Sequence, residues 1–168
     1  ESALQLLLTH KKLSFVLKAV QNLDTTSYLS RTCCEKLVTH RAVPILFELI
    51  RSCNRSKPHM AVMQHSINIV HHLLYCKSTR DAVLQDSELL FLAAELIQSY
   101  RDKGQVFLDS VKLLSICCQR DDYRSLIAKD KGVLKRLQGV IQLTERKLKT
   151  SAGSASRPAL RSVQNTKR

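Results

Sequence analysis

The chain has 168 residues, 44% of them hydrophobic, with four glycines, three prolines and a formal net charge of +13. A chain of this length can bury a core of its own, and the scarcity of turn-forming residues favours long helices over a β-sheet. No run of 18 apolar residues argues for a membrane span, and the charge predicts attraction to a polyanion such as nucleic acid or the acidic face of a protein.

Apolar residues recur at intervals of three and four along most of the chain, which predicts an all-α fold. We expect Asp24, Thr25 and Thr26 to cap the second helix, because short polar side chains accept hydrogen bonds from N–H groups at a helix start. Pro44 and Pro58 fall in first turns, where a missing N–H costs nothing. The expected helices cover residues 2–22, 27–40, 42–54, 57–76, 79–85, 87–102, 105–119, 122–129 and 132–149.

Three segments of the chain resemble one another. Residues 44–50 (PILFELI) align with 91–97 (FLAAELI), 47 positions later, and with 135–141 (KRLQGVI), a further 44 positions on. Each follows a short helix, and the first two precede a longer one. Three-helix units of this length are typical of armadillo and HEAT repeats, which bury their apolar faces against neighbouring units. We therefore predict an armadillo/HEAT-like α-solenoid of about three stacked repeats over residues 1–149.

Residues 150–168 contain Ser, Ala, Pro, Arg and Lys without an apolar stripe, so we expect a flexible basic tail. Residues 145–168 carry seven Lys or Arg and one acid, Glu145. The tail is therefore expected to add salt-dependent attraction to an acidic partner. The tail cations expected to act in this way are Arg146, Lys147, Lys149, Arg157 and Arg161.

The corner LIRSCNRSKPHM, residues 49–60, concentrates charge between two predicted helices. Cys53 and His59 are only two of the roughly four ligands that a structural zinc site needs. Arg51 and Arg55, with the N–H groups that open the next helix, could bind an anion. A plain hinge between two helices is the favoured interpretation, with this basic corner as a weaker binding hypothesis.

The helix predicted over 57–76 carries four His and ends near Cys76, and His72 and Cys76 are spaced to chelate together. It has no Asp or Glu, so the carboxylate that usually supports such a site is missing. No G-x-S-x-G elbow, Gly-rich phosphate loop or His/Asp pair beside a plausible Ser occurs. We predict no metal, no cofactor and no enzyme activity. Six cysteines without a C-x-x-C indicate a reduced, intracellular protein.

In armadillo arrays the third helix of each unit lines a concave groove, here the helices at 11–22, 57–76 and 105–119. The stretch LKAVQNL, residues 17–23, resembles the usual groove pattern, with Lys18 in the place of the usual Trp. Without the Trp ladder, binding of nuclear-localisation peptides is not expected. We predict a mildly basic groove whose contacts with a protein partner are Lys18, Asn22, Asn68, His72 and Lys112.

Residues 140–149 (VIQLTERKLK) resemble the front half of a calmodulin-binding IQ motif, but Ser151 stands where a later cation is expected. The same residues supply the apolar stripe of a repeat helix, which is the favoured interpretation.

Residues 19–74 resemble the C-terminal region of the abnormal spindle protein family, on the strength of AVQNL, CCE and above all LIRSCNRS followed by Pro58 and Met60. The resemblance continues more weakly through AELIQSYRDK. It implies an α-solenoid end of a large, calmodulin-binding spindle-pole protein that gathers microtubule minus ends, with no catalytic residues. It also implies location in the cytoplasm, on the cytoskeleton and spindle pole, and in the nucleus during interphase. Because the chain starts at Glu1 without an initiator Met, we expect a fragment.

Three function classes remain open. The leading hypothesis is a non-catalytic, monomeric scaffold that binds a protein partner with an acidic surface, tubulin being one candidate. The alternative is an electrostatic nucleic-acid-binding module, against which stand an aromatic content of 5% and the absence of Trp. An enzyme has only the His/Cys stripe in its favour, and stoichiometric zinc would revive it.

Overall fold

The computed structural model describes residues 12–85 and 87–155, apart from the side chains of 147, 148 and 150–155, and every regular element in this part is an α-helix. The all-α prediction is therefore confirmed. The predicted start of the first helix, Arg157 and Arg161 lie outside the described residues. The helices are α2 (Leu13–Leu29), α3 (Arg31–Thr39), α4 (Ala42–Ser52), α5 (Lys57–Tyr75), α6 (Lys77–Leu84), α7 (Glu88–Ser99), α8 (Gly104–Cys117), α9 (Asp121–Lys129) and α10 (Lys131–Ala155).

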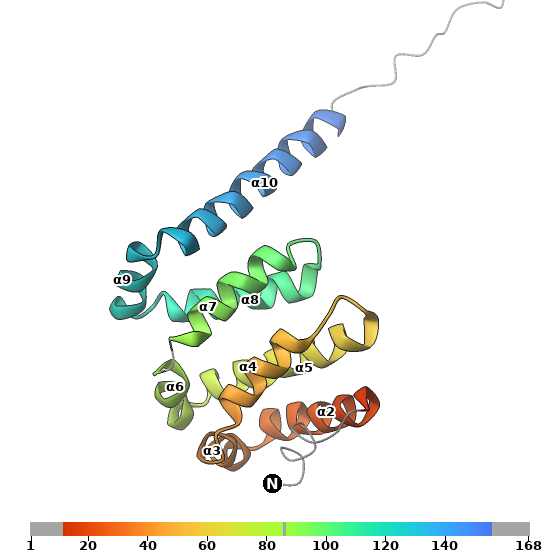
Figure 1. Cartoon of the computed structure of the whole chain (residues 1–168), viewed down its shortest axis with the longest axis vertical. Coiled ribbons are helices and arrows are strands. Elements are labelled where there is room, and N and C mark those ends of the chain that lie inside the picture. Colours follow the sequence, from red (N-terminus) through yellow and green to blue (C-terminus); the bar gives the residue numbers. More distant parts are fainter. Residues whose placement is uncertain (1–11, 86, 156–168) are drawn as a thin grey trace, which may run out of the picture.

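The helices are layered along the long axis of the molecule (Figure 1). The short helices α3, α6 and α9 follow one another along one edge, while α4 and α7 lie in front of α5 and α8. Helix α5 is the centre of the packing, because it contacts α2, α4, α6 and α8. Helix α10 packs on α7 and α9 and continues away from the rest of the fold.

The core is continuous from α2 to α9 and is built mainly of Leu, Ile and Val. In α5, Val62, Met63, Ile67, Val70 and Leu74 have no exposed surface. These residues recur at the three- and four-residue intervals that predicted the helix. Burial of each large side chain of this kind contributes about 1.5–3 kcal/mol. The apolar pattern therefore identifies the buried side of each helix correctly.

The predicted break after residue 22 is wrong, because α2 continues to Leu29. The Thr25 and Thr26 hydroxyls donate to the carbonyls of Gln21 and Asn22, at 3.1 and 2.8 Å, instead of capping a new helix. Such bonds to the preceding turn let Thr remain inside a helix. The cap of α3 is Ser30, whose Oγ accepts from the Cys33 N–H at 3.2 Å.

Arg41, the residue just before α4, has a left-handed backbone, φ 54°. A non-glycine residue adopts this conformation only at some cost in free energy. Helix α10 also departs from the prediction, since it runs to Ala155 rather than ending at 149. No proline interrupts residues 150–155, and the helix continues through them without an apolar stripe.

Candidate partner-binding surface

The predicted groove residues lie on three helices that are packed side by side. Lys18 and Asn22 belong to α2, Asn68 and His72 to α5, and Lys112 to α8. The structure brings Asn68, His72 and Lys112 into one polar network that crosses the three helices. Lys18 and Asn22 are exposed on α2 and take no part in the network's side-chain hydrogen bonds among the described residues.

The α2–α5 half of the network is centred on Asp24, whose side chain is only 14% exposed. Its carboxylate accepts from Asn68 Nδ2 at 3.0 Å and from His65 Nδ1 at 2.7 Å. His72 Nδ1 lies 3.6 Å from the other carboxylate oxygen. Burial lowers the pKa of His72, against an opposing effect of the Asp24 charge, so His72 resists protonation at neutral pH.

The α5–α8 half is centred on Asp109, which is 4% exposed. Its carboxylate accepts from Gln64 Nε2 at 2.7 Å, Gln105 Nε2 at 2.8 Å and Lys112 Nζ at 2.8 Å. Burial raises the pKa of Asp109, but these three hydrogen bonds together outweigh burial and hold the pKa below its usual range. Gln64 Nε2 also donates to Asn68 Oδ1 at 3.2 Å and so joins the two halves.

Ser27, His72 and Asp24 are brought together, a grouping that the sequence analysis did not predict. Ser27 Oγ lies 2.9 Å from His72 Nδ1, the same ring nitrogen that faces Asp24. In a Ser-His-Asp triad the serine and the carboxylate must contact opposite ring nitrogens, so that one accepts a proton while the other is held. This arrangement cannot relay a proton in that way, and Ser27 is itself 4% exposed. The trio holds helices together.

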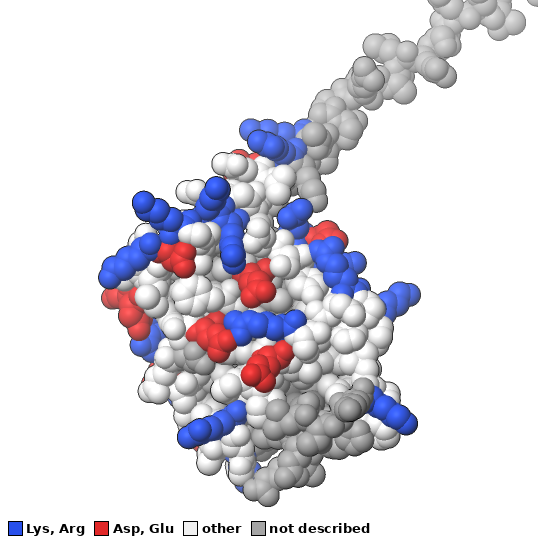
Figure 2. Space-filling model, in the orientation of Figure 1, with Lys and Arg blue, Asp and Glu red and all other residues white. Residues whose placement is uncertain are grey.

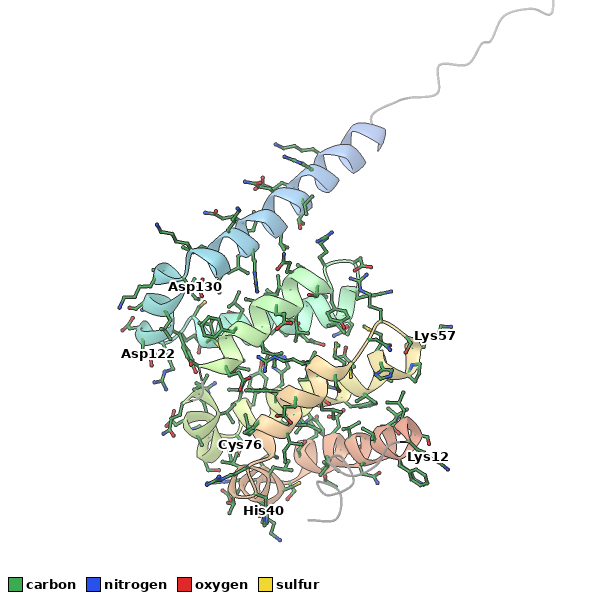
Figure 3. The ribbon with its side chains drawn as sticks, in the orientation of Figure 1. Lys12, His40, Lys57, Cys76, Asp122 and Asp130 are labelled. Atoms are coloured by element: carbon green, nitrogen blue, oxygen red, sulfur yellow. The ribbon has the colours of Figure 1, made fainter. Side chains whose placement is uncertain are left out.

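Metal ligands do not converge in the described part of the chain, where no group of three or more His, Cys, Asp or Glu is placed to hold an ion. His72 bonds within the network, whereas Cys76 Sγ lies 3.3 Å from Ser78 Oγ. That hydrogen bond lowers the pKa of Cys76, while burial raises the pKa of Cys34 to about 11. Figure 3 labels Cys76 at the junction of α5 and α6.

A hollow of about 520 Å³ lies beside the network, lined by residues that include Tyr28, Arg31, Cys34, His72, Tyr75 and Cys76. Tyr28 and Tyr75 are 75% and 65% exposed, and the Tyr28 ring lies 5.4 Å from that of His72. Sequence reasoning missed both tyrosines as surface residues. Tyr28 was assigned to the start of a second helix rather than to the last turn of α2.

Arg51 and Arg55, the predicted basic corner, join α4 and the corner after it to α7 and the corner after that helix. Arg51 pairs with Glu88 and lies 3.8 Å from Glu95. Arg55 pairs with Asp102 at 2.9 Å, and its guanidinium lies over the Tyr100 ring at 5.5 Å. The corner thus has a structural role that the sequence analysis did not predict. Anion binding by these arginines stays a prediction.

The cations of the predicted tail are only partly described. Arg146 and Lys149 are exposed on α10, and the side chain of Lys147 is not described. Lys and Arg gather over the end of the molecule that carries α10, whereas positive and negative side chains alternate over its middle (Figure 2). None of the described helices is long and apolar enough to span a bilayer.

Comparison with known proteins identifies relatives by sequence alone, since no family model and no solved structure matches the chain. The abnormal spindle-like microcephaly-associated protein homolog of Felis catus is 33% identical over 156 residues. The Canis lupus familiaris homolog and the Homo sapiens protein are each 32% identical over 156 residues. Each alignment covers 88% of this chain but 4% of the relative, so the chain spans a small part of its curated relatives. Identity above 30% along most of its length places the chain, as one region, in the abnormal spindle-like microcephaly-associated protein family.

Proposed function

We propose that the chain is a non-catalytic α-solenoid module of a spindle protein, and that it binds a protein partner along the surface formed by α2, α5 and α8. The spindle role comes from the printed name of the relatives. A location on the cytoskeleton, at the spindle pole, is part of the same proposal. The scaffold role is supported by the polar network described above. Among the described residues, this network joins helices and contains no catalytic arrangement of side chains.

The solenoid part of the proposal is supported by hydrogen bonds between corresponding helices. Asp24 and Asn68 join α2 to α5 across 44 positions, and Gln64 and Asp109 join α5 to α8 across 45. Glu35 and Ser78 join α3 to α6 across 43 positions. The sequence segments repeat after 47 and 44 positions. Near-constant separations of this kind are expected where each unit stacks on the next.

The corners that follow α4 and α7 are joined at a similar separation. Arg55, in the corner after α4, donates to the Ser99 carbonyl at the end of α7 across 44 positions and to Asp102 across 47. Corresponding segments of the chain therefore meet at nearly one separation in three places. An armadillo-like stack of repeats, with α3, α6 and α9 as the short helices, is the arrangement that this pattern favours.

The surface on α2, α5 and α8 has the properties of a docking face. Side chains already held by mutual hydrogen bonds lose little freedom when a partner binds. Beside them, the Lys112 side chain is 58% exposed, next to Leu108, 54% exposed on the same helix. On α2, Phe15 is 47% exposed and lies one turn from the exposed Lys18. Apolar groups beside cations suit a protein partner with an acidic and partly apolar surface.

The test is co-sedimentation with microtubules assembled from purified tubulin, whose acidic surface is the candidate target. We expect the double variant Lys18→Glu and Lys112→Glu to bind at least about tenfold more weakly than the parent, because it reverses charge on the docking face. The pair Lys36→Glu and Lys129→Glu makes the same change in net charge at exposed positions on α3 and α9, outside the docking face. Equal losses in both pairs would mean that net charge alone attracts microtubules, and the docking face would be rejected.

The contribution of the tail has its own test in a chain that ends at residue 155. Its binding should weaken and become less sensitive to salt, since part of the positive charge is gone. Unchanged binding would remove the tail from the proposal.

Nucleic-acid binding remains the second candidate, favoured by the cations that gather near α10. It predicts affinity that rises with oligonucleotide length and collapses with salt. The docking proposal predicts that affinity does not depend on oligonucleotide length. It also predicts that a short oligonucleotide does not displace the chain from microtubules.

A further inference from the structure

A second hollow, of about 390 Å³, lies between the end of α7 and the first half of α10. Its walls include Gln98 and Arg101 on the α7 side, and Gly132, Lys135, Arg136 and Gly139 on α10. The α10 residues recur at three and four positions, so they form one face of that helix. Figure 3 places Asp130, just before this face, at the junction of α9 and α10. Volumes in this range accommodate a short stretch of peptide.

The preceding boundary, between α4 and α7, is filled at the corresponding place. There Arg51 of α4 faces Glu88 and Glu95, which lie on one face of α7. In the alignment of the repeated segments, Glu95 corresponds to Gly139, and Glu88, seven positions earlier, corresponds to Gly132. Both carboxylates of the first boundary are thus replaced by glycines at the second. Space for a side chain is open at Gly139, where a Cβ meets no atom within 4 Å, whereas a Cβ at Gly132 would lie 3.0 Å from Asp130 Oδ1.

Three cations, Arg101, Lys135 and Arg136, surround this hollow. Within residues 12–85 and 87–155, no ion pair joins Arg101, Lys135 or Arg136 to a carboxylate. Asp130, the acid next to them in sequence, accepts from the Gly132 and Val133 N–H groups at 2.8 and 3.1 Å, and so caps α10. All three cations are exposed at the rim, while Val140, 6% exposed, forms part of the floor. An apolar floor under unpaired cations favours a ligand that is both acidic and partly apolar.

We propose that this hollow binds an acidic segment of a partner protein, whose carboxylates take the places that Glu88 and Glu95 occupy at the preceding boundary. An apolar side chain of the same segment would pack on Val140 and Leu143. The site is separate from the docking face on α2, α5 and α8. A loss of binding at one surface leaves binding at the other intact, so the two proposals fail independently.

The test uses a fluorescein-labelled peptide of Glu residues around a central Leu, titrated with the full chain in a fluorescence-anisotropy assay. The decisive variant is Gly139→Glu, which restores the missing carboxylate within the protein. A side chain fits there, since a Cβ at Gly139 meets no atom within 4 Å. We expect Gly139→Glu to weaken peptide binding at least tenfold and Gly139→Gln, of the same size but neutral, to weaken it less. Equal losses in the two variants would overturn the proposal.

Charge reversal on the rim gives a second, independent measurement. Lys135→Glu should weaken peptide binding at least tenfold, whereas Lys36→Glu, an equal change in net charge on α3, should change it less than twofold. A peptide with Gln in place of Glu should not bind. The proposal is overturned if Lys36→Glu matches Lys135→Glu. It is also overturned if a single-stranded oligonucleotide binds more tightly than the peptide and loses the same affinity in Lys135→Glu. Circular dichroism of each variant shows whether it folds.

Discussion

The two sides of the helix stack hold their polar groups in different ways. On α2, α5 and α8, Asp24 and Asp109 are mostly buried. Asp24 accepts hydrogen bonds from two residues of α5, and Asp109 accepts one from α5 and two from its own helix. On α4 and α7, the Arg51 and Glu88 side chains are 35% and 42% exposed. Water can replace a lost partner on the second side but not on the first. Substitutions in the buried network are therefore expected to lower stability, whereas an exposed ion pair can be replaced by other residues at little cost in free energy.

The α7–α10 boundary illustrates the exchange. Both acids of the α4–α7 boundary are absent there, and yet Val133 and Val140 of α10 remain buried. Apolar packing holds the helix in place, so the rim above it is free to vary. This freedom would let one boundary be closed by ion pairs and the next bind an acidic ligand, as proposed above.

The largest effect is expected from Asp109→Ala. The substitution removes the acceptor of three side-chain hydrogen bonds, including the Gln64 bond that joins α5 to α8, which costs about 1–3 kcal/mol of unfolding free energy. Urea unfolding followed by circular dichroism measures the change. Asp122→Ala, on an exposed pair with Arg120, serves as the matched control and should leave the midpoint almost unchanged. Similar losses in the two variants would erase the distinction between the sides.

The pH dependence of stability should show the same contrast. Burial lowers the pKa of His71 and His72 below the ordinary value of 6.5, so the unfolded chain takes up protons first as the pH falls. Stability should therefore begin to fall near pH 6.5. The pKa of Asp109 is also lowered, so its contribution is present above about pH 4 and is lost as the pH falls through the folded pKa.

Unfolding measured from pH 8 to pH 2.5 should thus lose stability in two stages. Asp109→Asn should remove much of the lower stage and leave the upper one in place. His72→Gln should reduce the upper stage only. If the stability of Asp109→Asn falls at low pH as much as that of the parent, exposed carboxylates govern acid unfolding instead.

Much of this architecture could be predicted from apolar spacing alone. The bounds of α4, α5 and α9 fall within about two residues of those expected, since each has a strong stripe and a clear start. The α2–α3 corner could not be placed, because Thr25 and Thr26 have the same sequence signature as cap residues but bond back into α2. Contacts with other helices decide whether such residues cap a helix or continue it. Here Asp24, next to Thr25, accepts a hydrogen bond from Asn68 of α5.

The residues proposed for the candidate surface came from the register of the predicted repeats, and the structure places three of them, Asn68, His72 and Lys112, in one polar network. Their role in binding a partner stays a prediction. The register could not identify Asp24 and Asp109 as the acceptors in that network, because the side chain of an aspartate is usually exposed. The replacement of two acids by glycines on α10 becomes visible in the repeat alignment only once the structure shows that Arg51 pairs with Glu88 and Glu95.

Gly139→Ala should stabilise the protein by about 0.5–1 kcal/mol, because glycine inside a helix costs backbone entropy and a Cβ at this position meets nothing. This result would show that the hollow is not required by packing. Gly104→Ala, at the first residue of α8, is the control and should give a smaller gain. Urea midpoints compare the two. Destabilisation by Gly139→Ala would mean that α7 and α10 need the close approach of a glycine, contrary to the exchangeable boundary described above.

The smallest effect is expected from Arg51→Gln, which gives the first boundary the residue type that Gln98 supplies at the second. Both partners of Arg51 are more than one-third exposed, so the loss should be about 0.5 kcal/mol or less. A double-mutant cycle with Glu88→Gln isolates the pair from other contacts of either side chain. A coupling energy near 2 kcal/mol would place this pair with Asp109 rather than with exposed pairs. Gly132 and Gly139 would then mean that the α7–α10 boundary lacks ion pairs that stabilise the fold at the α4–α7 boundary. That result would strengthen the proposal that a ligand binds at the α7–α10 boundary.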